Sequence, residues 1–273
     1  MKKFVKTLAV SLIAVLATVA LTGCEASNVF TYTIDSSYSD YIVMGTSADY
    51  APYESLAEVD GKQTIVGIDI EIAKHIAAAL GKNLKVINKG FDFLLEDLEA
   101  GKVDFVMAGM TPTEERALVV DFSTVYYEAV QVVLIQAANA SLYTSIESLN
   151  VATVKVGAQL GTIQQDLVAD NFPLSQQVIV QTIPDLALQL QGGQLQAVVM
   201  EKPVADGYVA NMEGLSIAEI VIGDPDGGSA VAVQKGDSAL LATINAVLAQ
   251  LMADGTIDAI VAEAIQNNVS AAE

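Results

Sequence analysis

Residues 70–88 read IEIAKHIAAALGKNLKVIN, and within them a helical pattern passes directly into a strand pattern. Isoleucine and leucine recur at helical spacing on one face, which predicts an amphipathic helix over residues 70–80. Gly81 suits the left-handed end of such a helix. The short apolar run that follows, residues 84–88, is typical of a buried strand.

The same alternation continues on both sides of this stretch. Residues 41–45 precede it as a predicted strand, and residues 94–100 follow it as a helix that ends at Gly101. Residues 103–108 then read as another strand. Strands and helices that take turns in this way indicate an α/β unit with a largely parallel sheet.

A second series repeats this alternation after about residue 132. It predicts strands at residues 155–158, 178–181 and 196–200, and helices at residues 163–169, 184–191 and 203–211. Two α/β units of similar size are therefore expected in tandem.

The carboxyl-terminal part crosses a turn-rich segment, residues 223–228, before a predicted strand at 230–233 and helices at 238–253 and 257–266. A segment this short cannot form a third hydrophobic core. We expect it to return to the first unit, so that two crossings join two lobes with a cleft between them.

The composition argues against several classes of function. The chain has 273 residues, with 33 acidic and 13 basic side chains and a formal net charge of -20, which phosphate backbones would repel. One cysteine and one histidine cannot build a zinc site or an iron–sulfur cluster. We therefore expect no nucleic acid partner, no metal and no cofactor.

The amino terminus has the pattern of a secretory signal peptide. Three lysines precede an apolar run, residues 7–21, which is shorter than the roughly 20 residues that a membrane-spanning helix needs. The segment Leu21-Thr22-Gly23-Cys24 resembles the lipobox of bacterial lipoproteins. This resemblance implies cleavage before Cys24 and lipid chains that hold the protein on the outer face of the cytoplasmic membrane. The alternative is a free cysteine in an uncleaved leader.

Several motifs, taken in order, resemble those of the polar amino acid branch of the periplasmic solute-binding proteins, the extracytoplasmic components of ABC importers. The motifs are residues 45–53 (GTSADYAPY), 67–73 (GIDIEIA), 91–95 (FDFLL), 108–116 (AGMTPTEER), 120–123 (VDFS), 126–127 (YY) and 159–162 (QLGT). The match runs from about residue 41 to residue 265. It implies a two-lobed periplasmic-binding-protein type 2 fold, in which each lobe is a mostly parallel sheet flanked by helices and a two-strand hinge joins the lobes.

On this resemblance the chain divides into a leader, a tether and two lobes. We expect a signal peptide over residues 1–23, a tether over 24–40, a first lobe over 41–131 plus 226–273, and a second lobe over 132–225. The hinge is expected near residues 128–132 and 225–230.

A free amino acid presents a carboxylate, an ammonium and a side chain, so its receptor needs a cation, an anion and a pocket. The resemblance places the carboxylate at Arg116, whose guanidinium can make two parallel charge-assisted hydrogen bonds. It adds Gly109 and Thr111 on the first lobe and Thr162 on the second, where the start of a helix offers backbone N–H donors. Arg116 itself is expected just inside a short helix that begins near Thr113.

The ammonium is expected at Glu201, which follows the predicted strand at 196–200 and stands where the family often has aspartate. The residues that match the side-chain pocket of the family are Ser47, Asp49, Tyr50, Phe91 and Gln159. The two aromatic rings could stack on a guanidinium, and Asp49 would suit a cationic side chain. Ser47, however, occupies a position where many relatives that bind basic amino acids or amides have aspartate. Cationic and neutral polar ligands therefore both remain open.

The sequence thus predicts a monomeric, lipid-anchored receptor that captures a free polar amino acid outside the cell and delivers it to an ABC permease. The main alternative is an enzyme on the same fold, similar to cyclohexadienyl dehydratase, with Glu201 as a general acid in a dry cleft. A ligand-sensing module is the third possibility.

Overall fold

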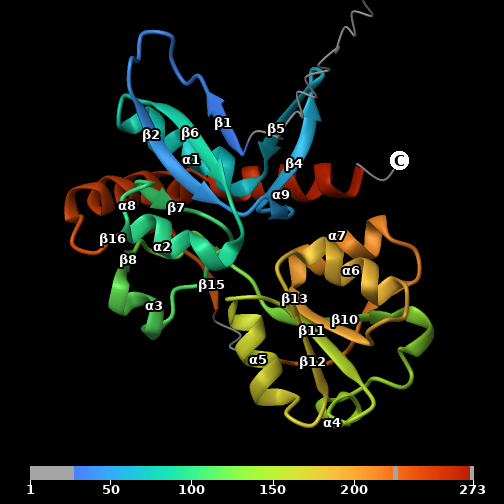
Figure 1. The fold of residues 1–273 in the computed structure, drawn as a ribbon. Helices are drawn as coiled ribbons and strands as arrows, with labels where there is room; N and C mark the ends of the chain where they lie inside the picture. The colour runs from blue at the N-terminus through green and yellow to red at the C-terminus, as the bar shows by residue number, and fades with distance from the viewer. Residues whose placement is uncertain (1–27, 224–226, 271–273) are drawn as a thin grey trace, which may run out of the picture.

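Two α/β lobes make up the protein in a computed structural model, which describes residues 28–223 and 227–270 (Figure 1). The predicted signal peptide, the lipobox with Cys24 and the first residues of the predicted tether lie outside the described residues. The helices and strands of the described residues follow the predicted alternation closely, with boundaries that differ by one to a few residues.

The first lobe is built on a six-stranded sheet with the order β1-β6-β2-β7-β16-β8. These strands are β1 (Val29–Tyr32), β2 (Tyr41–Thr46), β6 (Asn83–Asn88), β7 (Phe105–Val106), β8 (Val120–Phe122) and β16 (Ala232–Gln234). Strands β6, β2 and β7 are parallel, whereas β1 and β16 run antiparallel to their neighbours and β8 runs antiparallel to β16. The return of β16 from the carboxyl-terminal segment completes this lobe.

Helices cover both faces of the first sheet. They are α1 (Ile68–Ala79), α2 (Leu94–Glu99), α8 (Ser238–Ala253) and α9 (Thr256–Ser270), with the short η1 (Phe91–Phe93) before α2 and α3 (Glu114–Val119) after β7. Helix α1 buries its isoleucines against one face together with α8 and α9, and α2 buries Leu94 and Leu98 against the other. The apolar stripe predicted for residues 70–80 is the face that packs on the sheet.

The second lobe has a five-stranded sheet with the order β12-β11-β13-β10-β14. Its strands are β10 (Gln131–Gln136), β11 (Lys155–Gln159), β12 (Gln176–Val180), β13 (Ala197–Glu201) and β14 (Leu215–Ile217); the helices are η2 (Ala137–Asn139), α4 (Ile146–Leu149), α5 (Ile163–Asn171), α6 (Ile183–Gln191) and α7 (Lys202–Asn211). Successive residues of β10 and β13 alternate between two apolar clusters, because strand side chains point to opposite faces. Helix α5 covers one face, and α6 and α7 cover the other.

The two lobes are joined at a short antiparallel pair, β9 (Tyr127–Glu128) and β15 (Gly228–Ser229). Both crossings of the chain therefore lie side by side, near the positions expected for the hinge. Part of the second crossing, residues 224–226, lies outside the described residues.

A small three-stranded sheet in the first lobe was absent from the prediction. It consists of β3 (Asp49–Tyr50), β4 (Glu54–Val59) and β5 (Lys62–Val66). Strands β4 and β5 form a hairpin whose two loop residues, Asp60 and Gly61, both have positive φ, at 53° and 72°. Asp-Gly is a typical sequence for such a turn, so a sequence signal was present.

The predicted tether through residue 40 was wrong for the segment that forms β1. This strand pairs antiparallel with β6 at the edge of the first sheet. Phe30 and Tyr32 pack on the main core, and the Tyr32 hydroxyl donates a hydrogen bond of 2.6 Å to the carbonyl oxygen of Ile65. Apolar contacts made by a segment with a polar composition thus extend the folded part toward the amino terminus.

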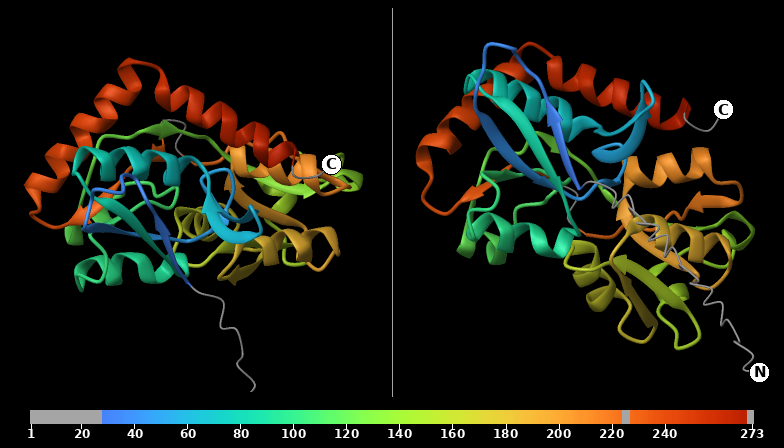
Figure 2. Two further views of the ribbon diagram at one scale, coloured as in Figure 1. Left: turned by 90° about the horizontal axis from the view of Figure 1, so that it is seen from above. Right: turned by 45° about the horizontal axis from the view of Figure 1, so that its top comes forward.

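Helix α9 contacts both lobes. It packs against α1 and α8 of the first lobe and against α7 of the second (Figure 2).

No single helix among the described residues is long and apolar enough to cross a membrane, and only α8 and α9 taken together, bent by 79°, meet the criteria of length and composition.

Candidate functional site

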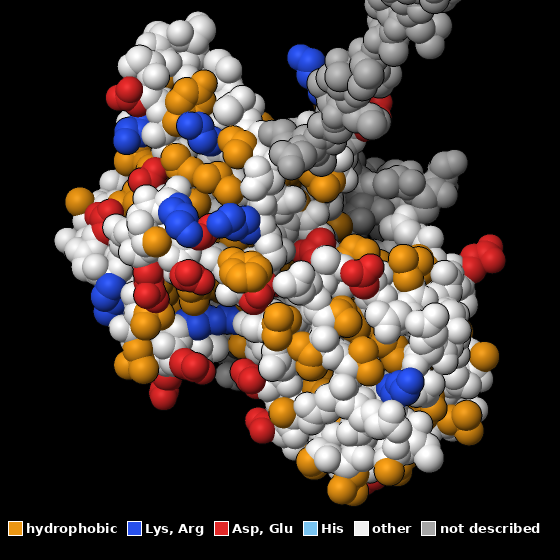
Figure 3. Space-filling model, viewed as in Figure 1, with side chains coloured by type: hydrophobic (Ala, Val, Ile, Leu, Met, Phe, Trp, Pro, Cys, Tyr) orange, Lys and Arg blue, Asp and Glu red, His pale blue; other side chains and the backbone are white. Residues whose placement is uncertain are grey.

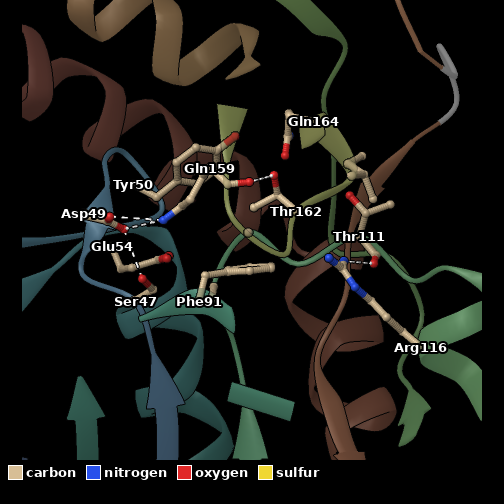
Figure 4. Close-up of a pocket in the computed structure, with 13 residues that line it drawn as sticks. Ser47, Asp49, Tyr50, Glu54, Phe91, Thr111, Arg116, Gln159, Thr162 and Gln164 are labelled. Atoms are coloured by element: carbon tan, nitrogen blue, oxygen red, sulfur yellow. Dashed lines mark hydrogen bonds between the residues drawn. The ribbon is translucent and has the colours of Figure 1, made fainter. Parts of the chain in front are cut away.

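A pocket between the lobes brings together nearly all of the predicted ligand-binding residues (Figure 4). The first lobe contributes Ser47, Asp49, Tyr50, Glu54, Phe91, Ala108, Gly109, Thr111 and Arg116, and the second contributes Gln159, Thr162, Ile163 and Gln164. Of the predicted set, only Glu201 is not in this lining.

The lobes are closed around this pocket. Its free volume is about 10 Å³, which is close to the roughly 10–15 Å³ that a single water needs. An amino acid can therefore enter only after the lobes have moved apart.

Arg116 is positioned by the start of α3. The Thr113 hydroxyl caps this helix by accepting a hydrogen bond from the Arg116 backbone N–H at 3.2 Å, as the sequence predicted for a helix beginning there. The guanidinium donates from Nη1 to the Thr111 carbonyl oxygen at 2.7 Å. From Nη2 it donates to the Gly161 carbonyl oxygen of the other lobe at 3.0 Å.

In its surroundings Arg116 remains a cation that can bind an anion. Burial lowers the pKa of Arg116 to about 10, against the opposing effect of Asp166 and Glu115, so the guanidinium stays protonated at neutral pH. Its central carbon lies 5.3 Å from the centroid of the Phe91 ring. Its hydrogen bonds to neutral carbonyl oxygens leave its charge without a carboxylate partner among the described residues.

The amino terminus of α5 faces Arg116 from the second lobe. Thr162 is the cap residue, but its hydroxyl donates to the Gln159 carbonyl oxygen at 2.8 Å and makes no capping bond to the helix. Ile163 and Gln164, in the first turn, line the pocket. Helix N–H groups without intrahelical partners favour an anion at this end.

The opposite end of the pocket is acidic. The Asp49 carboxylate accepts hydrogen bonds from the Ser47 hydroxyl at 3.1 Å and, across the lobes, from the Gln159 side-chain amide at 3.1 Å. It also accepts one from the Ile183 backbone N–H at 3.4 Å, at the start of α6. Burial nevertheless raises the pKa of Asp49 to about 6.

Glu54 is a pocket residue that the sequence analysis missed. It opens β4, directly after the GTSADYAPY motif, and its side chain is completely buried. Neither carboxyl oxygen has a hydrogen-bond partner among the described residues. The Asp69 carboxyl adjoins it, and two carboxyls can share a hydrogen bond only when one is protonated. Burial, with the nearby acids adding to it, raises the pKa of Glu54 well above its usual range.

Glu201 stands at the carboxyl end of β13, as predicted. Its backbone N–H donates to the hydroxyl of the lining residue Tyr50 at 3.2 Å, but Glu201 itself is not part of the lining. The side chain is 1% exposed, and Oε2 has no hydrogen-bond partner among the described residues. Burial raises the pKa of Glu201 to about 7, although the nearby Tyr53 and Gln131 side chains lower it.

Aromatic rings form the walls between the two charged ends. Tyr50 stacks on Tyr53 with 5.5 Å between ring centroids. Gly109 has φ of 54°, and a Cβ there would lie 3.1 Å from the Tyr50 ring, so the close approach of this loop depends on glycine. Figure 4 shows Phe91 between Arg116 on one side and Asp49 and Glu54 on the other.

The pocket therefore has a positive end and a negative end within one enclosed space. This arrangement suits a small molecule that carries a carboxylate at one end and a cation at the other. Among the described residues, no group of three or more His, Cys, Asp or Glu side chains is arranged to hold a metal ion.

Comparison with known proteins identifies the family. The family of bacterial extracellular solute-binding proteins, family 3, matches residues 42–267. The chain belongs to this family. The predicted two-lobed fold and the predicted class of function, a receptor for amino acid import by an ABC transporter, are thereby confirmed.

Individual members of the family are similar over most of their length. The arginine-binding extracellular protein ArtP of Bacillus subtilis (strain 168) is 35% identical over 90% of this chain and 93% of its own. The ABC transporter arginine-binding protein 1 of Escherichia coli (strain K12) is 29% identical over 82% and 90%, respectively. The solved structure of the amino acid ABC transporter substrate-binding protein AbpA from Streptococcus pneumoniae, bound to L-arginine, has a TM-score of 0.81 and 35% identity over 84% of this chain and 96% of that chain.

Proposed function

We propose that this family member binds a cationic amino acid, in the first place L-arginine, outside the cell and delivers it to an ABC permease. One observation carries the choice of a cationic ligand: the partly buried carboxyl of Asp49 and the completely buried carboxyl of Glu54 lie in the same pocket as Arg116 and at its opposite end. The arginine-binding relatives support the same choice.

The carboxylate of the ligand would lie between Arg116 and the start of α5. The guanidinium uses one N–H each for Thr111 and Gly161, so it keeps donors for two carboxylate oxygens. The Gly109 and Thr111 loop contributes from the first lobe and Thr162 from the second. A carboxylate held by both lobes stabilises the closed state.

The cationic side chain would reach Asp49 and Glu54. Phe91 and Tyr50 would hold its stem and stack on a guanidinium. Glu54 supplies a carboxyl that a bound cation would favour in its ionised form, although Ser47 replaces the aspartate of many relatives. A buried carboxyl without a partner is costly, so a cation that pairs with it gains more than it would at the surface.

The ammonium group of the ligand is assigned to Glu201. Oε2 of Glu201 is buried and has no hydrogen-bond partner among the described residues, and the Glu201 backbone is bonded to the pocket residue Tyr50. The acidic surface helps at an earlier stage, because a net charge of -20 attracts a cation and acidic side chains follow the border between the lobes (Figure 3).

Transport follows from closure about β9 and β15. Ligand binding shifts the population to the closed form, which the permease recognises. Lipid on Cys24, which lies outside the described residues, would keep the monomeric receptor at the membrane surface.

Isothermal titration calorimetry with L-arginine, L-lysine, L-glutamine and L-citrulline tests the proposal. Citrulline is the matched control because it has the shape of arginine without its side-chain charge. We expect arginine to bind at least about a hundredfold more tightly than citrulline, since the charged hydrogen bonds at two carboxyls are lost. Equal affinity for the two, or a preference for glutamine, would contradict a cationic ligand.

The enzyme alternative has less support than transport, because the relatives compared above are transporter binding proteins. Incubation of the protein with cyclohexadienyl acids, followed by analysis for dehydrated product, would reveal such an activity. Turnover would favour the enzyme, with Glu201 as the general acid.

A further inference from the structure

A second and larger groove opens between the lobes beside the pocket. Its volume is about 620 Å³, within the roughly 300–1,000 Å³ typical of small-molecule sites. One wall comes from the β3–β4 segment of the first lobe, with Ala51, Ser55 and Leu56. The other comes from α7 of the second lobe, with Val204, Tyr208 and Met212.

Asp49 is the residue common to the groove and the pocket. Its carboxylate, with its bonds to Gln159 and Ile183, forms part of the partition between the two spaces. Thr182 and Pro184, on either side of Ile183, line the groove. A group that binds Asp49 from the pocket therefore stands at the entrance of the groove.

The groove is acidic at Asp49 and largely apolar along its walls. Tyr208 lies close enough to Asp49 and Asp185 for both carboxylates to raise the pKa of its hydroxyl, in addition to the larger effect of burial. Among the described residues that line the groove, none is Lys, Arg or His. This combination suits a cation that carries an apolar substituent.

We infer that the groove holds the substituent of a cationic amino acid whose side-chain terminal nitrogen is alkylated, while Asp49 binds the charged group itself. The inference rests on the proposed function, because the amino acid head group must be at Arg116 for the side chain to end at Asp49. It widens the ligand class from free arginine to N-alkylated guanidines and amines.

The test compares the affinity of the full chain for L-arginine and for Nω-propyl-L-arginine by calorimetry. We expect the propyl compound to bind within about threefold of arginine, because the substituent enters existing space instead of displacing a packed side chain. In Leu56→Trp, which fills the groove from a strand residue that is 44% exposed, the propyl compound should bind about tenfold more weakly or worse. The affinity of Leu56→Trp for arginine should stay within about twofold of the wild-type value.

Two further variants separate occupation of the groove from general damage. Met212→Trp fills the groove from the facing wall and should act like Leu56→Trp. Leu142→Trp adds the same side chain at a residue of the second lobe that is 62% exposed and outside the groove, and it should change neither affinity.

Each remaining outcome has a definite meaning. If arginine binds but the propyl compound binds a hundredfold more weakly, the inference is overturned and the proposed function stands. If the affinities for both ligands fall to the same extent in Leu56→Trp and Met212→Trp, the groove contributes to closure of the lobes and does not hold the substituent. If neither ligand binds wild type, the proposed function fails, and the inference fails with it.

Discussion

At the scale of single residues, the site is defined by ionisable groups that lie partly or completely buried without an opposite charge. Arg116 donates to neutral carbonyl oxygens, and Glu54 and Oε2 of Glu201 have no hydrogen-bond partner among the described residues. Unpaired buried charge is destabilising, so a protein that keeps it has a use for it. The same groups become favourable when a ligand of complementary charge arrives.

Glu54→Gln tests the role of the unpartnered carboxyl. The change keeps the shape but leaves no group that can ionise to pair with a bound guanidinium, so arginine affinity should fall by about 2 kcal/mol, or about thirtyfold, while citrulline affinity changes little. Calorimetry with both ligands measures this. Glu58→Gln, at an exposed position of the same strand, is the control and should have no effect. An equal loss for arginine and citrulline would mean that Glu54 only shapes the pocket.

The buried carboxyls also predict a pH dependence. Burial raises the pKa of Asp49 and Asp69 to about 6 and that of Glu201 to about 7, from about 4 in an unfolded chain. The folded protein thus holds these protons more tightly. The stability they contribute is complete below about pH 4 and is lost as the pH rises through 6 to 7. The ligand-free protein should therefore melt at a lower temperature at pH 8 than at pH 5.

Arginine should reverse part of that loss, because its cation favours the ionised carboxylates. The increase in melting temperature at a fixed arginine concentration should be larger at pH 8 than at pH 5. Thermal denaturation with and without arginine at both pH values measures this. A larger increase at pH 5 would show that the acidic groups do not face the ligand.

At the scale of elements, sequence patterns were sufficient to predict a helix or strand where its apolar residues recur at one regular spacing. Helix α1 and strand β6 were predicted nearly to the residue, because the isoleucine spacing changes abruptly at Gly81. Strands β4 and β5 were missed, since their short, largely exposed segments have no sustained apolar pattern. Strand β1 was missed because its place at a sheet edge comes from pairing with β6, which a local pattern does not reveal.

In the candidate site, too, some features could be predicted from local sequence motifs, whereas others depend on contacts between distant segments. Motif matching identified Arg116, Thr162 and Asp49, because their residue types and spacing are typical of the family. The burial of Glu54 against Asp69 and the bond from Gln159 to Asp49 depend on contacts between distant segments and between lobes. Such relations arise only in the folded molecule. The bond from the Glu201 backbone to Tyr50 is of the same kind.

At the scale of the whole molecule, one substitution tests the proposed attachment to the membrane through lipid on Cys24. Cys24→Ser should release the protein into the soluble fraction, because the thioether to lipid can no longer form. Fractionation of cells that express wild type and the variant, with immunodetection, measures the distribution. The variant should bind arginine with unchanged affinity. Membrane association that persists in the variant would mean that the leader stays as an anchor.

Helix α9, which packs on α1 and on α7, limits how the molecule can open. A wide swing on that side would expose apolar side chains of α7 and α9 to water, which is unfavourable. The lobes are therefore expected to part mainly along the edge remote from α9, while α7 slides along it by a small shear. Solute would then approach and leave through a single gate, on the edge that faces away from α9.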